Sequence, residues 1–307
     1  MGFGTSARLR ELLDGNSIAT LGGAHDALSA RIIEEAGYSG VWASSFGISL
    51  AYQCIPDADL LTMSEVLEVV RHIVKAVRSP VLADCNAGFG NAVNVMRMVR
   101  EFEAAGVAGV CIEDNLFPKR CSLYQDSHRG LLPAEEMVGK IRAAKAAQRD
   151  SDFVVVARLE ALIGGFGLGE ALERADAYSA AGADAILVHG KQFSQIQEFV
   201  AEWQGGLPLV VVPTLYNHVS LAELEQCGIR LAIYPNQAAR AAVRAMQEAM
   251  AEILRTGVAK NIDDRIVPLA EVYRLVRLSA LQEAEQSFLP SQTTTQAWTA
   301  SSHVKSS

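Results

Sequence analysis

The feature of this sequence that most constrains its fold is an eightfold alternation of short apolar runs and amphipathic helical patterns. The apolar runs are rich in β-branched residues and have the length of buried strands. They lie at residues 18–21, 40–44, 80–84, 109–113, 153–158, 185–189, 208–213 and 230–234. Helical patterns lie between them, for example at residues 27–35, 64–77, 93–105, 134–147, 170–180 and 196–203. Strands that alternate with helices in this way form a parallel sheet covered by helices.

Glycines mark the points where helices are expected to end. An Ala-Gly pair occurs at residues 36–37, 105–106 and 181–182, each a few residues before a predicted strand. Glycine is the commonest residue just beyond a helix end, so these pairs are typical of turns from helix to strand. Eight such units predict an α/β fold, a closed (β/α)₈ TIM barrel in preference to an open doubly wound sheet.

The composition limits the compartment and the partners. The 307 residues are 50% apolar and carry a formal net charge of −8, without the clusters of lysine and arginine that bind phosphate backbones. No apolar run approaches the roughly 18 residues of a membrane helix, and the first residues lack the hydrophobic stretch of a signal peptide. Five cysteines occur without a CxxC pair, which indicates free thiols. We expect a cytoplasmic protein without nucleic acid or membrane partners.

The last part of the chain has a different pattern. Residues 267–281 have helical spacing and predict one more helix beyond the barrel. Residues 286–307 are polar, rich in hydroxyls and aperiodic, which is typical of a flexible tail. We therefore predict one barrel domain with a C-terminal helix at 1–285 and a tail at 286–307.

Polar residues gather where the predicted strands end. They are Ser44, Ser45, Asp84, Asn86, Glu113, Asp114, Arg158, Glu160 and His189. The carboxyl ends of barrel strands, with the loops that follow them, carry the active site in enzymes of this fold. Charged groups in apolar surroundings also cost free energy unless they are paired or bound to metal. The pattern therefore favours an active site over a set of structural residues.

The acidic residues of this set indicate the metal. Asp57, Asp84, Glu113 and Asp114 supply oxygen atoms without accompanying cysteine or histidine pairs. Oxygen donors suit Mg²⁺ rather than zinc, and Mg²⁺ keeps several waters, so few of these carboxylates need to touch it. Asp57 lies in a Pro-Asp-Ala-Asp segment and can equally be a turn or capping residue.

Four other residues can serve a ligand. Gly88 gives flexible backbone where a ligand can approach closely. Arg158 can bind a carboxylate or phosphate through two hydrogen bonds, and His189 can shuttle a proton, donate a hydrogen bond or be a structural histidine. Cys121 lies between a cation and a hydroxyl on the loop after the fourth strand, where it can be a nucleophile of low pKa, a general acid or only a small loop residue.

Six segments in combination resemble the isocitrate lyase and phosphoenolpyruvate mutase superfamily over residues 5–285. They are most similar to the branch of phosphoenolpyruvate mutase and phosphonopyruvate hydrolase. The segments are Trp-Ala-Ser-Ser at 42–45, Gly-Phe-Gly-Asn at 88–91, Glu-Asp at 113–114, Phe-Pro-Lys at 117–119, Val-Val-Ala-Arg at 155–158 and Ala-Gly-Ala-Asp-Ala-Ile-Leu at 181–187. The resemblance implies a TIM barrel, Mg²⁺, a 2-oxo acid held as its enolate and a loop that closes over the site. It also implies a homotetramer, a dimer of dimers that exchange the final helix.

The resemblance further implies a role for each matching residue. The metal residues are Asp84 as the anchor, Asp57 and Glu113 through water, and Asn86. The substrate residues are Trp42, Ser44, Ser45, Gly88, Arg158 and His189, with Ser44 and Ser45 at the pyruvyl group and Arg158 and His189 at the phosphoryl group. The catalytic residues are Lys119, Cys121, Ser122, Arg158 and His189, of which the first three belong to the closing loop.

Three positions depart from this branch. Asn86 stands where a second aspartate is usual, Asn115 where the mutases have lysine, and Cys121 where they have asparagine. The Lys-Arg-Cys segment is similar to that of the carbon–carbon lyases, whose cysteine protonates the departing enolate. The following Ser-Leu is that of the mutases.

These departures leave three functions open. The leading prediction is a Mg²⁺-dependent enzyme that isomerises or hydrolyses the P–C bond of a phosphonopyruvate-like 2-oxo acid. The first alternative is a C–C lyase or oxo-acid decarboxylase of the methylisocitrate lyase type that uses Cys121. The second alternative, motivated by Asn86 and Asn115, is a barrel with impaired catalysis that only binds a 2-oxo acid. The retained Asp84 and Glu113 argue against it, because buried charges without a role are costly.

Overall fold

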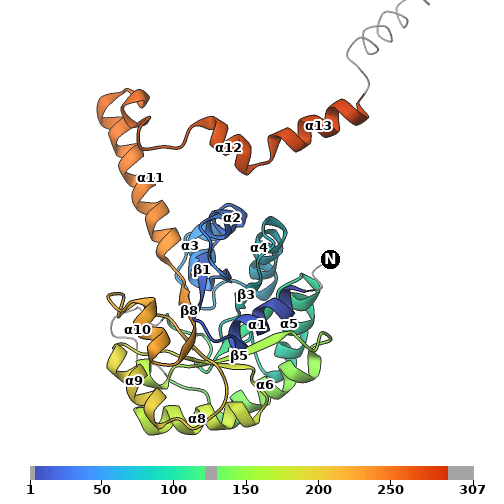
Figure 1. Cartoon of the computed structure of the whole chain (residues 1–307), viewed down its shortest axis with the longest axis vertical. Helices are drawn as coiled ribbons and strands as arrows, with labels where there is room; N and C mark the ends of the chain where they lie inside the picture. The colour runs from blue at the N-terminus through green and yellow to red at the C-terminus, as the bar shows by residue number, and fades with distance from the viewer. Residues whose placement is uncertain (1–3, 122–129, 290–307) are drawn as a thin grey trace, which may run out of the picture. The chain divides into compact units, whose positions relative to one another are not determined.

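The computed structural model describes residues 4–121 and 130–289, and it divides into two compact units, Met1–Val243 and Arg244–Ser307 (Figure 1). The first unit contains eight parallel strands that pair in chain order and close on themselves, so the predicted TIM barrel is confirmed. The strands are β1 (Ala19–Ala24), β2 (Gly40–Ala43), β3 (Val81–Asp84), β4 (Gly109–Glu113), β5 (Val154–Leu159), β6 (Ala185–Val188), β7 (Leu209–Val211) and β8 (Ile229–Tyr234).

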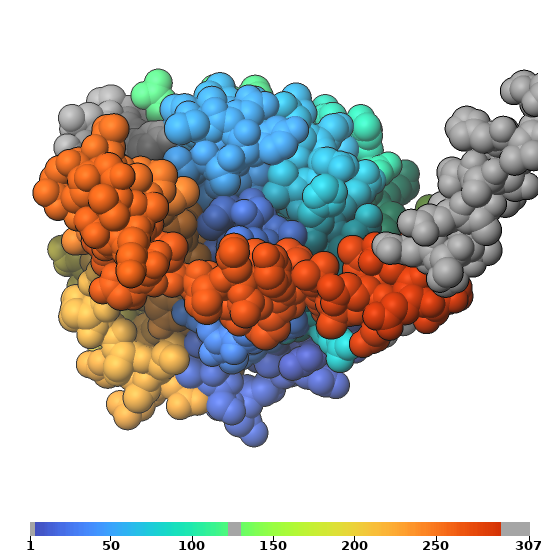
Figure 2. Space-filling view, turned by 90° about the horizontal axis from the view of Figure 1, so that it is seen from above, coloured from blue at the N-terminus to red at the C-terminus, as the bar shows by residue number. Residues whose placement is uncertain are grey.

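Helices surround these strands. They are α1 (Thr5–Asp14), α2 (Ala27–Glu35), α3 (Ser45–Gln53), α4 (Met63–Ala76), α5 (Ala92–Ala104), α6 (Ala134–Ala147), α7 (Ala161–Gly164), α8 (Leu168–Ala180), α9 (Phe193–Glu202) and α10 (Leu221–Gln226). Several begin with capping boxes, in which a polar side chain accepts a hydrogen bond from the first turn, as Thr62 does before α4. In the space-filling view the light-blue and cyan segments, which include α3 and α4, lie side by side (Figure 2).

The first strand extends further than its sequence pattern predicts, from residue 21 to Ala24. The predicted strand ends at residue 21, before Gly22 and Gly23, and glycine is uncommon inside strands. The structure shows why glycine is needed at this point: a Cβ atom at Gly23 would collide with the carbonyl oxygen of Pro235. These glycines allow close packing of the backbone and do not end the strand.

Two hydrophobic layers build the barrel. The outer layer lies between the strands and the surrounding helices, and the inner layer fills the barrel with side chains such as Leu21, Trp42, Leu82 and Leu187. Helix α1 belongs to the inner layer through Leu9 and Leu13. Its Arg10 bonds Asp184 at 3.1 Å and the Phe153 carbonyl at 3.3 Å, next to the beginnings of β6 and β5. Helix α1 therefore closes the amino-terminal end of the barrel.

Strand periodicity places the polar residues at the opposite end of the interior. Side chains two positions apart on a strand face the same way, so each inner-layer residue is followed by a second inward residue nearer the carboxyl end. The pairs are Trp42 and Ser44, Leu82 and Asp84, Cys111 and Glu113, Val156 and Arg158, and Leu187 and His189. The barrel interior is therefore apolar in its inner layer and polar at the carboxyl ends of the strands. We call this polar end the mouth.

The second unit is helical. Helix α11 (Gln237–Thr256) runs into it and is followed by a short 3₁₀ turn (Ala259–Ile262), α12 (Leu269–Leu275) and α13 (Leu278–Phe288). The single helix expected at 267–281 is two helices, because Arg277 adopts a left-handed conformation with φ 55°. Helix α13 reaches Phe288, within the segment expected to be a tail, and residues 290–307 of that segment lie outside the described residues. No helix among the described residues is long and apolar enough to span a membrane.

Candidate active site

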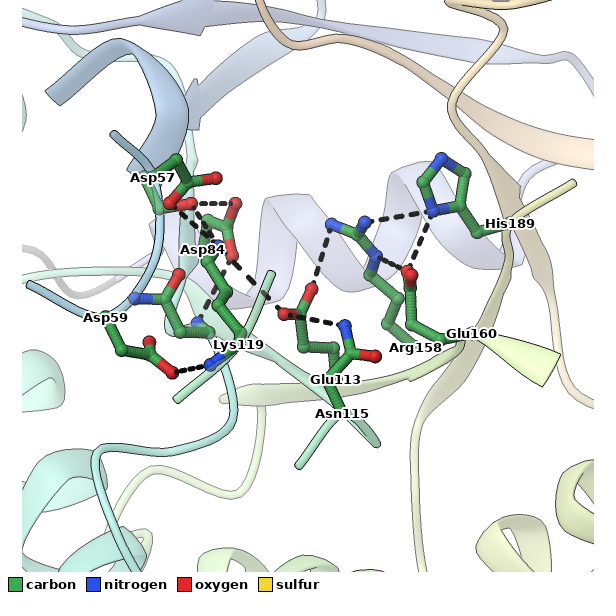
Figure 3. Close-up of polar contacts among 11 residues, drawn as sticks. Asp57, Asp59, Asp84, Glu113, Asn115, Lys119, Arg158, Glu160 and His189 are labelled. Carbon is green, nitrogen blue, oxygen red and sulfur yellow. Dashed lines mark hydrogen bonds and ion pairs between the residues drawn. The ribbon is translucent and has the colours of Figure 1, made fainter. Parts of the chain in front are cut away.

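The ends of five strands bring predicted site residues together at the polar mouth. Ser44, Asp84, Glu113 and His189 are buried, and the Arg158 side chain is 11% exposed. Figure 3 shows Glu113 at the centre, with an acidic group around Asp57 and Asp84 on one side and Arg158 with His189 on the other (Figure 3). We call these the acidic half (Asp57, Asp84, Glu113) and the basic half (Arg158, His189).

Lys119 lies within the acidic half. Its Nζ is 2.9 Å from Asp57 Oδ1 and 4.0 Å from Glu113 Oε1. The same atom donates to the hydroxyl of Ser45 at 3.0 Å, and that hydroxyl donates to Asp84 Oδ2 at 2.7 Å. Its backbone N–H donates to Asp59 Oδ2 at 2.7 Å. Burial would lower the pKa of Lys119, but the surrounding carboxylates outweigh it and raise the pKa well above 10.5.

Glu113 connects the two halves. Its Oε2 is 3.4 Å from the Arg158 guanidinium, and its Oε1 accepts a hydrogen bond from Asn115 Nδ2 at 3.1 Å. Burial raises the pKa of Glu113 to about 7, although Lys119 and Arg158 act in the opposite direction. Desolvation therefore opposes the charge of this carboxylate even with two cations nearby, and a further cation would favour the ionised form.

The basic half is built around Glu160, whose side chain is fully buried. Its Oε1 is 2.6 Å from Arg158 Nε and 2.8 Å from His189 Nδ1. Arg158 also approaches His189 Nδ1 with its NH2 group at 2.9 Å. Burial would lower the pKa of Arg158, yet Glu160 and Glu113 outweigh it and hold the pKa well above its usual range, so the guanidinium is charged.

A second buried network lies behind the basic half. Asp114 Oδ1 accepts from the backbone N–H of Glu160 at 2.9 Å. Its Oδ2 accepts from Arg174 at 3.0 Å and from the Tyr178 hydroxyl at 2.9 Å, both on α8. Burial raises the pKa of Asp114, and these hydrogen bonds together with Arg174 oppose the rise. Asp114, predicted as a possible metal ligand, thus bonds protein groups on both of its oxygens.

Two predicted residues from the second strand and the α3 terminus have local partners. Ser44 caps α3, since its hydroxyl accepts from the Gly47 N–H at 3.2 Å. Trp42 lies one layer deeper in the barrel and is 1% exposed, and its indole Nε1 has no hydrogen-bond partner among the described residues. An unpaired buried N–H costs free energy, so a ligand with a hydrogen-bond acceptor could pair with this donor.

The remaining predicted residues lie on the loops after β3 and β4. Gly88 follows β3 with φ 88°, where a Cβ would also meet Val95. Cys121 is buried, at 7% exposure. Ser122 lies outside the described residues.

Sequence reasoning assigned no role to Asp59 and gave Glu160 only a place at a strand end. Asp59 lies two residues after Asp57, and nothing in its local pattern indicates the bond to Lys119. Its pKa is raised by burial, although Lys119 acts against the rise. Glu160 lies two residues after the inward-facing Arg158, so its side chain also faces the interior of the barrel. This two-residue spacing is the sequence signal that could have indicated Glu160 as a site residue.

The residues of the acidic half fit a magnesium ion. All donors are oxygens, and Asn86 has a buried Oδ1 without a partner in the described part of the chain. Its backbone N–H donates to Asp84 Oδ1 at 3.2 Å, which holds it beside that carboxylate. Among described residues no three His, Cys, Asp or Glu side chains form a metal cluster. Mg²⁺ commonly takes one or two carboxylates and completes its shell with water and substrate.

Comparison with known proteins finds a matching family model and similar relatives. The model of the phosphoenolpyruvate phosphomutase family matches residues 9–254. A phosphonopyruvate hydrolase from Variovorax sp. (strain Pal2) is 43% identical over 284 residues, which are 92% of this chain and 98% of the relative. A 2,3-dimethylmalate lyase from Eubacterium barkeri is 37% identical over 290 residues, covering 92% and 98%.

Solved structures agree with this result. A phosphoenolpyruvate phosphomutase from Streptomyces platensis subsp. rosaceus superposes with a TM-score of 0.90 at 45% identity, over 93% of this chain and 99% of the other. A phosphonopyruvate hydrolase in complex with oxalate and Mg²⁺ superposes with a TM-score of 0.87 at 42% identity, over the same shares of the two chains.

Proposed function

The chain belongs to the phosphoenolpyruvate phosphomutase family, and from this premise we propose that it breaks the C–P bond of phosphonopyruvate, or of a closely similar 2-oxo acid, with the help of Mg²⁺. The observation that carries the proposal is the division of the mouth into two halves. A phosphonopyruvate-like molecule has an oxo acid at one end and a phosphoryl group at the other. An acidic half for a metal and a basic half for a phosphoryl group match these two ends.

The acidic half would serve the oxo-acid end. Asp84, Asn86 and Glu113, with Asp57, are the residues that would hold Mg²⁺. When bound, Mg²⁺ would offset the negative charge that develops on the oxo-acid oxygens as the bond at C3 breaks. The nearby Ser44 would orient the carboxylate of the substrate.

The basic half would serve the phosphoryl end. The Arg158 guanidinium can donate two parallel hydrogen bonds to phosphoryl oxygens. Cleavage leaves the electron pair of the C–P bond on C3 as the enolate of pyruvate, and Arg158 with His189 would stabilise the phosphoryl group in transit. Transfer to the enolate oxygen gives phosphoenolpyruvate. Transfer to water gives phosphate, and protonation of C3 then gives pyruvate.

Phosphorus NMR tests this proposal directly. The protein is incubated with phosphonopyruvate and Mg²⁺, and the signals of phosphoenolpyruvate and phosphate are followed. We expect one of the two products to form, and Arg158→Gln to reduce its formation about ten- to hundredfold, since a charged hydrogen bond to the transferred group is lost. Arg142→Gln, at an exposed position on α6, is the matched control. Phosphonopyruvate that stays unchanged with the unaltered protein would refute the proposal.

A second candidate rests on Cys121 and on the 37% identity to a 2,3-dimethylmalate lyase. A buried thiol on the loop after β4 could protonate the enolate that a C–C cleavage releases. Incubation with 2,3-dimethylmalate or 2-methylisocitrate and Mg²⁺, with detection of pyruvate or propionate, tests it. Cleavage of either acid with no reaction of phosphonopyruvate would favour the lyase.

We also propose that the chain forms a homotetramer from dimers that exchange their C-terminal helices. Within the second unit α12 and α13 bury no residue, and Met250 and Leu254 are 60% and 88% exposed. Apolar side chains exposed along helices favour burial in a partner subunit. We expect Leu254→Glu to reduce the mass measured by light scattering, whereas Gln247→Glu, at an exposed position on the same helix, leaves it unchanged. A wild-type protein with the mass of a monomer would refute this proposal.

A further inference from the structure

Glu160 stands out because one oxygen atom contacts both members of the basic half. Its Oε1 lies 2.6 Å from Arg158 Nε and 2.8 Å from His189 Nδ1, and its side chain is fully buried (Figure 3). A carboxylate oxygen can accept hydrogen bonds from two donors at once. Glu160 can therefore hold the guanidinium and the imidazole in fixed positions relative to each other.

Nδ1 of His189 lies within hydrogen-bond distance of both Glu160 and Arg158, and these two groups require opposite protonation of the nitrogen. The Glu160 carboxylate only accepts, so it needs a proton on Nδ1. The Arg158 NH2 group, 2.9 Å away, only donates, so it needs Nδ1 without a proton. The distances allow both contacts, but the imidazole can satisfy only one of them in a given tautomer.

The charges of the two partners decide between these tautomers. With an ionised Glu160, protonated Nδ1 gives a hydrogen bond between an N–H and a carboxylate, which is the stronger type. An unprotonated Nδ1 would instead face the carboxylate with a lone pair. Nε2 is then an acceptor in the neutral form of the ring and a donor in the imidazolium.

Glu160 is itself held from behind and from the following helix. Its backbone N–H donates to Asp114, and its carbonyl accepts from Gly164 of α7 at 2.8 Å. The N–H of Ile163, on the same helix, donates to the His189 carbonyl at 3.1 Å. These bonds join the ends of β5 and β6 into one rigid corner, which gives the carboxylate a defined position.

We propose that Glu160 is a positioning residue that fixes the Nδ1–H tautomer of His189 and the orientation of the Arg158 guanidinium. The consequence for catalysis rests on the proposed function, in which the basic half holds a phosphoryl group. Glu160 acts through its two partners and does not touch the substrate. Without its charge, Nδ1 becomes the acceptor for Arg158, and both groups turn toward each other.

The tautomer is measurable without substrate. Protein with ¹⁵N-labelled histidine shows, in long-range ¹H–¹⁵N correlation spectra, which ring nitrogen carries the proton, and a His189→Gln variant assigns the signal among the six histidines. We expect a protonated Nδ1 in the wild type and an unprotonated Nδ1 in Glu160→Met, which has no oxygen that could accept from Nδ1. An unprotonated Nδ1 in the wild type overturns the proposal even if the variant does not fold, and so does a protonated Nδ1 in a folded Glu160→Met.

Two further variants separate positioning from general disturbance. Arg158→Gln removes the competing donor and should leave the proton on Nδ1. Glu170→Gln removes a carboxylate that bonds Arg174 at 2.7 Å on the far side of the buried network, and it should leave the His189 signals unchanged. A change of tautomer in either variant would assign control of the ring to a residue other than Glu160.

Kinetics give the functional readout. We expect Glu160→Met to raise KM for phosphonopyruvate about tenfold or more, while Mg²⁺-dependent binding of oxalate, which has no phosphoryl group, changes less than about twofold. If the variant weakens the interaction with phosphonopyruvate and the binding of oxalate equally, or weakens neither, the positioning role is overturned. If the wild type does not react with phosphonopyruvate, the proposed function fails, and the tautomer measurements still decide the role of Glu160.

Discussion

Replacement of Lys119 by methionine should destabilise the metal-free protein, and Mg²⁺ should reverse much of the loss. The side chain is 3% exposed, and its ammonium lies 2.9 Å from Asp57 and 4.0 Å from Glu113. Methionine has a similar shape but no charge. The backbone bond from residue 119 to Asp59 does not depend on the side chain and is retained.

The magnitude follows from the burial of these charges. Removal of one partner of a buried ion pair typically costs about 3–5 kcal/mol, because the other charges stay behind without compensation. The pKa of Lys119 is raised above 10.5, so below that pH the stabilisation by the ammonium is complete. At pH 8 the substitution therefore removes all of it. Mg²⁺ at a hundred times its Kd would add back about 2.7 kcal/mol.

The loss should also depend on pH. The pKa of Glu113 is about 7 in the folded protein and 4.5 for an unperturbed glutamate, so the folded state binds more protons between these values. Its contribution to stability therefore falls as the pH rises through this window. Without the Lys119 cation the folded pKa rises further, and the fall extends to higher pH. At pH 6, protonation of Glu113 would reduce the loss of unfolding free energy in the variant.

Urea unfolding followed by circular dichroism measures these effects. The free energies of unfolding of Lys119→Met and of Lys191→Met, a control at an exposed position, are compared at pH 6 and 8 with and without Mg²⁺. A difference of less than about 0.5 kcal/mol between the two variants at pH 8 without metal, the usual size of surface effects, would refute the reasoning.

Three further substitutions test other parts of the site. Cys121→Ser should keep most of the turnover of phosphonopyruvate, whereas its loss, measured by phosphorus NMR, would indicate a proton donor of the lyase type. Asn86→Asp should tighten Mg²⁺ binding about tenfold in calorimetry, because aspartate also tolerates φ 51° and adds a charge near Asp84; an unchanged Kd would separate this residue from the metal. Tyr178→Phe should cost about 1–3 kcal/mol of unfolding free energy, since buried Asp114 loses a donor, and Tyr52→Phe, at a 49% exposed position, is the control; equal values for the two would contradict the role of this bond.

The barrel and the position of the mouth could be predicted from the sequence because both depend on local periodicity. A strand reverses its side chains at every residue, so the two-residue step from Leu82 to Asp84 already places the aspartate on the same face as the core. The recurrence of this step at Glu113, Arg158 and His189 made the cluster predictable without coordinates.

Contacts that depend on loop conformation could not be predicted in this way. Lys119 lies 62 residues from Asp57, and only the path of the loop after β4 brings its ammonium between the carboxylates. The left-handed conformation of Arg277 likewise could not be predicted from its residue type, since such conformations favour glycine and asparagine. The helical spacing continues across it, and the prediction of one helix instead of two followed from that continuity.

The closure of the barrel floor by α1 places a set of structural residues at the end of the barrel opposite the mouth. Leu9 and Leu13 fill the amino-terminal end, while all the residues proposed for chemistry lie beyond the apolar filling at the other end. Mutations at the floor therefore change stability and leave the residues of the mouth in place, whereas mutations at the mouth change the chemistry and, as expected for Lys119→Met, can also reduce stability. Substitutions at positions such as Asn86, Asn115 and Cys121 could thus change the reaction during evolution. The packing of α1 against the barrel floor contributes folding free energy that offsets the destabilisation such substitutions cause.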